Sequence, residues 1–291
     1  MTRDAHDRVA GHADSPEPTD LEPTDLESIG PEPIDPEPID PEPIARTEAL
    51  GTVAQTSTRW TMSRRRIDEW MDDPNLDPAR HAAALAGLRR LNRISLVASQ
   101  MMRFLENQLD DRRDAPVQLL DIASGSGDLP LHWARHWRMR RPLRVTLSDR
   151  SELPLQEACR VAKSFGCELQ TIHSDWGNLP TDRVYDVATC SLFLHHLEPA
   201  EVVSLVTKLT GIARRVVLCD LVRSRFNLSS VAIASRLVSR SDVVHHDATA
   251  SIRGAYRPAE WRHLFRQVTS EQIEIRRLHP ARMIAVLPGN P

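Results

Sequence analysis

The chain has 291 residues and a formal net charge of −3, from 37 basic and 40 acidic side chains. Its four cysteines form no C-x-x-C pair and no histidine lies at zinc-ligand spacing from them, so the composition excludes a disulfide framework and predicts no metal site. No apolar run reaches the roughly 20 residues that a membrane-spanning helix needs, and no apolar secretory signal opens the chain. We therefore expect a reduced, cytoplasmic protein without stable membrane insertion.

The charge is distributed unevenly along the chain. Residues 1–45 carry 13 acidic side chains against two arginines, together with 9 of the 21 prolines, and repeat a pentapeptide of the P-E-P-I-D type. Such a segment buries too little apolar surface to offset the entropy of ordering. We therefore predict a disordered tail over residues 1–58, which acts as a spacer or solubilising arm.

The rest of the chain is basic. The 246 residues after the acidic segment carry a net charge of +8, almost all of it from arginine. These arginines are not interleaved with aromatic residues, so we expect a solvated surface and no nucleic-acid partner.

Residues 59–115 are predicted to form a helical cover for the domain that follows. Asp77 supplies an N-cap and Pro78 the first helical position. Apolar residues then recur every three or four positions, at Leu85, Leu88, Leu91, Ile94, Val97, Met101, Leu105 and Leu109. This spacing predicts one amphipathic helix or a pair of them.

Short apolar runs alternate with helical stretches from residue 116 to the end, and we assign residues 116–291 to one α/β domain. The predicted strands are 117–122, 143–147, 168–172, 184–189 and 215–219, followed by 272–278 and 283–287. Alternating strands and helices predict a parallel sheet covered on both faces. The last two strands are separated by four residues, too few for a crossover helix, so they should form an antiparallel hairpin.

The most informative stretch is the glycine turn directly after the first predicted strand. It reads Asp121-Ile-Ala123-Ser124-Gly125-Ser126-Gly127-Asp128. A dinucleotide fingerprint starting at Gly125 would need glycine where the sequence has Pro130, which disfavours an NAD-dependent oxidoreductase.

The turn instead resembles motif I of the class I S-adenosylmethionine-dependent methyltransferases, D-x-G-x-G-x-G, with alanine at the first glycine position. The resemblance implies a Rossmann-like, doubly wound, mostly parallel sheet of seven strands. It also implies S-adenosylmethionine as the cofactor, bound by Asp121, Ala123, Ser124, Gly125, Ser126 and Gly127.

Acidic residues after the next two strands fit the same resemblance. Asp149 lies 22 residues beyond Gly127, where the family has the acid that accepts both ribose hydroxyls, and Arg150 follows it. Asp175 and Trp176 occupy the position that contacts the adenine. Either acid taken alone could be an ordinary turn residue, but the carboxyl edge of such a sheet is where open α/β folds bind ligands.

The fourth strand leads through Ser191, a further cofactor-binding candidate, to His195 and His196. Small-molecule methyltransferases of the ubiquinone and menaquinone type carry a similar histidine pair, beside the sulfonium and the acceptor. An imidazole is partly neutral at working pH, so both histidines are candidate bases for a phenol or enol. The alternative is structural: one histidine packs in the core while the other caps the next helix.

Residues 221–260 are longer than a plain crossover and are predicted to bind the acceptor. Their amino-acid sequence is similar to that of bacterial methyltransferases associated with phenolic and polyketide products. The residues expected to line the pocket are Arg223, His246, Asp247, Arg253 and Tyr256. A satisfied surface ion network is the competing interpretation.

We therefore predict a methyltransferase that acts on the oxygen or carbon of a small hydroxylated aromatic, phenolic or quinone-like acceptor. The alternatives are an NAD-dependent oxidoreductase and a non-catalytic interaction protein that keeps the fold. Methylation of RNA or protein amino groups is disfavoured because the N/D-P-P-Y/F signature is absent after the fourth strand. The sequence leaves the oligomeric state open.

Overall fold

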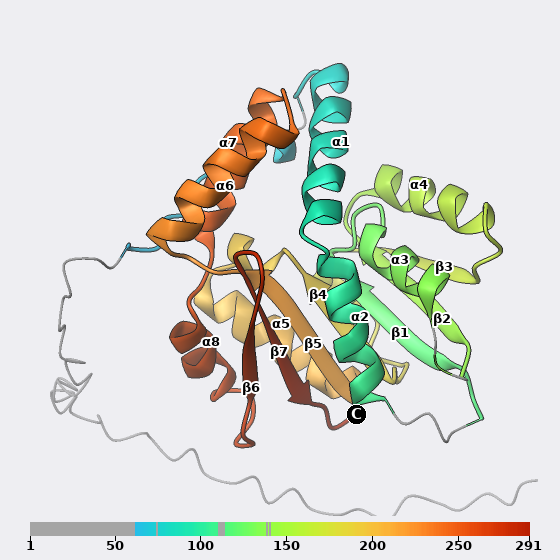
Figure 1. Ribbon diagram of the computed structural model, residues 1–291. Coiled ribbons are helices and arrows are strands. Elements are labelled where there is room, and N and C mark those ends of the chain that lie inside the picture. The colour runs from blue at the N-terminus through green and yellow to red at the C-terminus, as the bar shows by residue number, and fades with distance from the viewer. Residues whose placement is uncertain (1–61, 74, 110–113, 138, 140) are drawn as a thin grey trace, which may run out of the picture. The chain divides into compact units, whose positions relative to one another are not determined.

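The computed structural model describes residues 62–73, 75–109, 114–137, 139 and 141–291 (Figure 1). The predicted disordered tail, residues 1–58, lies outside the described residues. The helices are α1 (Pro78–Ile94), α2 (Val97–Gln108), α3 (Asp128–His136), α4 (Glu152–Lys163), α5 (Pro199–Ile212), α6 (Arg225–Val238), α7 (Asp242–Gly254) and α8 (Pro258–Phe265). Three single 3-10 turns are η1 (Trp70–Asp72), η2 (Trp176–Asn178) and η3 (Leu194–His196). Within these ranges, no helix combines the length and apolarity needed to span a bilayer.

Seven strands form one mixed sheet in the order β3-β2-β1-β4-β5-β7-β6, which confirms the predicted fold class. They are β1 (Val117–Ile122), β2 (Leu143–Asp149), β3 (Leu169–His173), β4 (Val187–Ser191), β5 (Arg215–Leu221), β6 (Glu274–Leu278) and β7 (Arg282–Pro288). The pairs among β1 to β5 are parallel. β7 runs antiparallel to both β5 and β6, as the predicted hairpin requires.

Several strand boundaries differ from their predictions by one to three residues, and β4 differs at both ends. β4 begins at Val187 rather than at residue 184, because Tyr185 pairs with Ala213 only as an isolated bridge before the regular ladder starts. The strand also extends to Ser191, which carries the chain to the edge of the sheet where β1 and β2 end.

Both faces of the sheet are covered by helices, and the side chains of β1 alternate between them. Leu119 packs in a core with α2, α3 and α4, whereas Leu120 packs in a second core with α5 and α8. Figure 1 shows α2 and α3 in front of the sheet and α5 behind it. This two-sided burial explains why the strands read as apolar runs rather than as alternating patterns.

The leucine-rich segment before the domain forms two helices. Asp77 caps α1 by accepting a hydrogen bond from the backbone N–H of Arg80 at 2.9 Å, and Pro78 follows as the first helical residue. α1 ends before Leu96, whose φ of +53° breaks the helical path. α2 then packs on the sheet, while α1 packs on α6 and α7 beyond the end of β5 (Figure 1).

The contact of α1 with the helices after β5 depends on a small residue. Ala84 of α1 packs with Val243 and Val244 of α7 in a small apolar core. A Cβ at Gly87 would lie 2.6 Å from Ser239 Oγ and 2.8 Å from Val244 Cγ2. Glycine therefore allows α1 to approach α7 and the chain before it, at the edge of the sheet where the parallel strands end.

Candidate functional site

The glycine turn after β1 adopts left-handed backbone angles at three positions. Ala123, Gly125 and Gly127 have φ angles of +50°, +52° and +67°. The turn is closed by a hydrogen bond of 2.9 Å from the Gly127 N–H to the Ser124 carbonyl. Glycine adopts these angles without strain, whereas Ala123 does not, so alanine at this position of the motif carries a conformational cost.

Asp149, at the end of β2, ties this turn to the neighbouring strand. One carboxylate oxygen accepts a hydrogen bond from the Gly125 N–H at 2.7 Å, and the other accepts from the Ser151 N–H at 2.9 Å. Arg150 lies beside it, exposed, with its guanidinium 3.6 Å from the Asp72 carboxylate. The structure thus brings the acid of the second strand directly against the glycine turn.

Asp121 is buried beneath the turn and accepts a 2.5 Å hydrogen bond from the Thr189 hydroxyl of β4. Burial, together with the nearby charge of Asp149, raises the pKa of Asp121 to about 7, against the lowering effect of the Thr189 hydrogen bond. A cation placed near this carboxyl would favour its ionised form.

The end of β3 and the end of β4 supply the remaining predicted cofactor contacts. Asp175 is exposed and caps η2 by accepting from the Gly177 N–H at 2.8 Å, while Trp176 is half-buried against the core beside α5. Ser191 lies at the end of β4, where its hydroxyl donates to the Met101 sulfur at 3.5 Å. All of these positions share the carboxyl edge of the sheet.

His195 is held rigidly by Asp220 of β5. The Asp220 carboxylate accepts from the His195 backbone N–H and contacts the imidazole Nδ1, both at 2.8 Å. Burial alone would lower the pKa of His195, but the charges and hydrogen bonds of Asp220 and Glu69 raise it to about 10.

His196 lies against His195, with ring centroids 4.1 Å apart, and is more accessible. Its side chain is 29% exposed, compared with 5% for His195. Burial lowers the pKa of His196, and so does the positive charge of His195.

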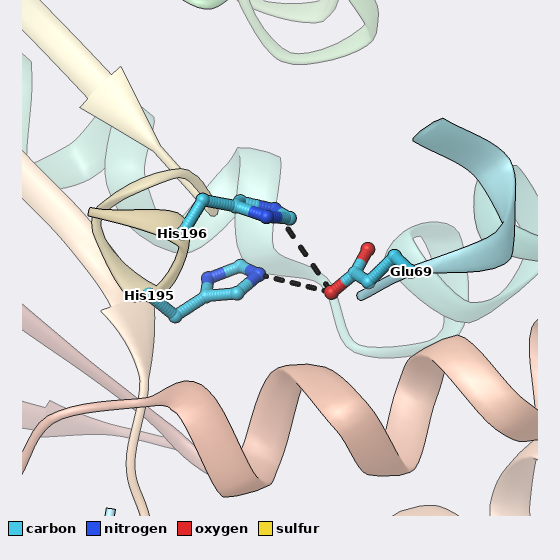
Figure 2. A group of neighbouring side chains, drawn as sticks. All are labelled: Glu69, His195 and His196. Carbon is cyan, nitrogen blue, oxygen red and sulfur yellow. Dashed lines mark ion pairs between the residues drawn. The ribbon is translucent and has the colours of Figure 1, made fainter. Parts of the chain in front are cut away.

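A third member of this cluster, Glu69, was not singled out by sequence reasoning. Its Oε1 lies 3.4 Å from His195 Nε2 and 3.9 Å from His196 Nε2 (Figure 2). Glu69 also accepts a hydrogen bond from the Ser251 hydroxyl. Burial would raise the pKa of Glu69, but the two histidines and Ser251 lower it overall. Glu69 lies outside every motif and periodic segment used in the sequence analysis, so no signal in the sequence identified it.

Residues 62–73, which carry Glu69, are fastened across the ends of η3 and α7. The Arg64 guanidinium donates to the carbonyls of His195, Leu197 and Gly254 at 2.7 to 3.1 Å. The backbone N–H groups of Trp70 and Met71 donate to the Asp247 carboxylate at 2.8 and 3.1 Å. This anchoring sets the position of Glu69 from both sides.

The five predicted acceptor-binding residues surround the same segment, but they do not form one wall. Arg223 is buried and donates to the Met62 and Ala255 carbonyls and to the Glu260 carboxylate. Asp247 is buried beneath Trp70, on which His246 stacks at 4.2 Å. The Tyr256 hydroxyl donates to the Leu197 carbonyl at 2.7 Å.

Of these five residues, Arg253 and His246 are partly exposed, whereas the other three are buried. Arg253 is half-buried near the end of α7, where its carbonyl accepts from the Arg65 N–H at 3.1 Å.

Two surface clefts lie beside the glycine turn rather than at the histidine pair. Their volumes are about 310 and 240 Å³, and both are lined by Arg89, Arg93, Asp128 and His132, between α1 and α3. Only the larger cleft also reaches Ser126. The chemistry-bearing cluster of Glu69 and the two histidines therefore lies outside both clefts.

Comparison with known proteins agrees with this geometry. Residues 119–216 match the family model of a methyltransferase domain. No curated protein matches the chain at a significant level. The predictions of an S-adenosylmethionine-dependent methyltransferase and of its cofactor are confirmed at the level of this domain.

Solved structures share the fold at low sequence identity. The plantazolicin methyltransferase BpumL, crystallised with a triazolic desmethylPZN analog and S-adenosylhomocysteine, superposes with a TM-score of 0.58 at 16% identity, covering 74% of this chain and 92% of its own. Its complex with S-adenosylhomocysteine alone gives 0.56 at 13% identity over the same shares. A protein from Nostoc punctiforme PCC 73102 assigned as an O-methyltransferase gives 0.53 at 16% identity, over 77% of this chain and 64% of its own.

Proposed function

We propose that this chain transfers the methyl group of S-adenosylmethionine to an oxygen or carbon of a small hydroxylated aromatic, phenolic or quinone-like acceptor. The observation that carries the proposal is the cluster of Glu69, His195 and His196 beside the strand ends that carry the cofactor motif. A phenol or enol must lose its proton to become a good nucleophile, and this cluster places a proton-accepting imidazole, that of His196, at that edge because burial and the charge of His195 lower the pKa of His196.

The backbone around Gly125 supports the cofactor assignment. A Cβ at Gly125 would meet nothing within 4 Å, so the turn leaves open space into which a ligand can approach the backbone. Each carboxylate oxygen of Asp149 accepts one backbone hydrogen bond and keeps a further lone pair, which is available to a ribose hydroxyl. BpumL, which shares the fold, binds S-adenosylhomocysteine.

The step itself asks for alignment more than for chemistry by the protein. The sulfonium supplies an already activated methyl group. The acceptor loses its proton to the neutral imidazole of His196, its electron pair forms the new bond to the methyl carbon, and the carbon–sulfur bond breaks with its electrons remaining on sulfur. The enzyme must hold the nucleophile about 3 to 3.5 Å from that carbon and exclude water.

The predicted acceptor-binding residues have different roles in this proposal. His246 and Arg253 are partly accessible and would contact the acceptor. Arg223, Asp247 and Tyr256 are buried in contacts with residues 62–73 or with η3 and α7, so they would shape the pocket from behind.

Titration calorimetry with S-adenosylhomocysteine tests the cofactor half of the proposal. We expect micromolar binding by the wild type and severe weakening in Asp149→Ala, because both the ribose acceptor and the clamp on Gly125 are lost. The control Asp182→Ala removes an exposed acid that precedes β4, away from the carboxyl ends of the parallel strands, and should bind S-adenosylhomocysteine like the wild type. Failure of the wild type to bind would overturn the assignment.

Mass spectrometry of methylated products tests the acceptor half. The chain should methylate members of a panel of phenols, catechols and quinols in the presence of S-adenosylmethionine. His196→Gln should reduce turnover while leaving S-adenosylhomocysteine binding intact, since His196 belongs to the acceptor side of the site. Methylation of peptides or nucleic acids with no turnover of the panel would contradict the acceptor class.

A further inference from the structure

The cluster of Glu69, His195 and His196 has the composition of a metal site. One carboxylate oxygen and two imidazole nitrogens lie within 4.8 Å of one another, contributed by segments 126 residues apart in the sequence. Figure 2 shows both imidazole rings directed at the same side of the Glu69 carboxylate. Two histidines with one carboxylate are a recurrent ligand set for divalent transition metals.

The outer nitrogens of both imidazoles face carboxylates of their own. His195 Nδ1 lies 2.8 Å from Asp220 Oδ1, and His196 Nδ1 lies 3.9 Å from Asp72 Oδ2. The Asp220 carboxylate on Nδ1 of His195 fixes the tautomer in which Nε2 carries the lone pair once a metal ion displaces the proton, as in the carboxylate–histidine–metal arrangement. Asp220 is itself held by the backbone N–H groups of His195 and Leu221, so the first imidazole is oriented before any ligand binds.

The distances inside the cluster favour a shared cation over direct hydrogen bonds. The Nε2 to Oε1 distances of 3.4 and 3.9 Å exceed the usual range of about 2.7 to 3.2 Å for such a bond. Two ligand atoms that each lie about 2.1 Å from one metal ion are about 3.0 Å apart at a right angle and about 3.4 Å apart at the tetrahedral angle. The shorter separation therefore equals that of two ligands at the tetrahedral angle and the longer one exceeds it by about 0.5 Å, so a bound ion would draw His196 and Glu69 slightly together.

The cluster is closed on one side and open on the other. The side chains of His195 and Glu69 are 5% and 15% exposed, whereas that of His196 is 29% exposed. Three protein ligands leave at least one coordination position free, as in catalytic rather than structural metal sites.

We propose that Glu69, His195 and His196 bind a divalent transition-metal ion of the zinc type, whose open position receives the oxygen of the acceptor. The site is argued from these side chains alone, and its role toward the acceptor rests on the proposed function. With the ion bound, His196 is a ligand and no longer the base, so the bound hydroxyl loses its proton to water. The metal stabilises the resulting oxyanion, whose electron pair forms the bond to the methyl carbon as the carbon–sulfur bond breaks. This assignment departs from the sequence analysis, which predicts no metal.

Metal binding by the full-length, tag-free chain tests the proposal without reference to turnover. The protein is stripped with a chelator and titrated with ZnCl₂ in a calorimeter, and its metal content is measured after equilibrium dialysis. We expect one equivalent of Zn²⁺, with at least a 100-fold loss of affinity in both Glu69→Gln and His196→Gln. Thermal melts of both variants establish that they are folded.

His136→Gln is the matched control, because His132 and His136 form a second histidine pair, with ring centroids 4.3 Å apart, on the surface of α3. This variant should keep the wild-type affinity and stoichiometry. The proposal is overturned if the wild type binds no Zn²⁺, if Glu69→Gln and His196→Gln bind like the wild type, or if binding is lost in His136→Gln instead.

A parallel titration with S-adenosylhomocysteine separates this inference from the proposed function. Binding of S-adenosylhomocysteine without Zn²⁺ would refute the metal site and leave the methyltransferase assignment intact. If the protein binds Zn²⁺ but not S-adenosylhomocysteine, the metal site is supported and the cofactor assignment of the proposed function is refuted.

Discussion

Gly127 is required by its backbone angle and by its surroundings, and the two requirements can be separated by experiment. Its φ of +67° disfavours any side chain, and a Cβ at this position would lie 2.6 Å from Cδ1 of Leu147, which is fully buried in β2. Gly166 has a similar φ of +71°, but a Cβ there would meet nothing within 4 Å. Alanine at both positions therefore shares the strain and differs in the clash.

The expected magnitudes follow from these contacts. A left-handed alanine costs about 1 kcal/mol, which predicts a loss of about 2 to 4 °C in Tm for Gly166→Ala in a domain of this size. Overpacking against a buried leucine adds about 1 to 3 kcal/mol, so Gly127→Ala should lower the Tm by about 5 to 15 °C. Gly127→Ala should also weaken S-adenosylhomocysteine binding, because the turn belongs to the cofactor motif.

Thermal and denaturant unfolding of the two variants measures this difference. Leu147→Val shortens the side chain that clashes with a Cβ at position 127. The double variant Gly127→Ala/Leu147→Val should therefore lose about 1 kcal/mol less free energy of unfolding than the two single variants lose in sum. Equal losses of stability in Gly127→Ala and Gly166→Ala, or strict additivity with Leu147→Val, would refute the reasoning.

Three further predictions concern the same region. Ala123→Gly should leave the free energy of unfolding unchanged or raise it by up to about 1 kcal/mol, because glycine adopts the φ of +50° without strain. The control Ala83→Gly, in the exposed part of α1, should lower the free energy of unfolding by about 1 kcal/mol, and a similar loss in both variants would contradict the strain at Ala123. The pKa of Asp121 is raised to about 7 in the fold, so the contribution of this group to stability is present at low pH and is lost as the pH rises through 7. Relative to Asp121→Asn, the free energy of unfolding of the wild type should fall by about 2 kcal/mol between pH 5.5 and 8, and a difference between the two proteins that does not change with pH would exclude the shift. Arg64→Ala removes the donor to three carbonyls, so it should increase hydrogen exchange across residues 62–73 and lower the free energy of unfolding by about 1 to 3 kcal/mol. The control Arg66→Ala loses the exposed ion pair with Glu198 and should change neither quantity appreciably.

The shared location of the predicted cofactor residues at one edge of the sheet could be anticipated from the sequence because it depends on local features. The glycine turn and the acids Asp149 and Asp175 each follow directly on an apolar run, and parallel strands place their carboxyl ends at one edge of the sheet. Strand identity therefore implied spatial proximity. The same logic predicted the final hairpin, since four residues allow only an antiparallel return.

Other features required the tertiary structure. The break between α1 and α2 lies at Leu96, whose left-handed angle no local pattern signals. Arg223 has the residue type expected of an acceptor contact, but the fold buries it against Glu260 and the carbonyls of Met62 and Ala255. Whether a polar residue faces a ligand or the protein depends on which distant segment covers it.

By itself, the sequence determined the sheet, the glycine turn and the histidine pair, because strand periodicity, turn chemistry and motif spacing are all written within a few residues of each other. Only the tertiary structure decided that Glu69 completes the cluster. That carboxylate lies 126 residues before His195, and its position results from the anchoring of residues 62–73 by Arg64 and Asp247. Long-range placement of this kind is set by packing and hydrogen bonds between distant segments, which leave no periodic trace in the sequence.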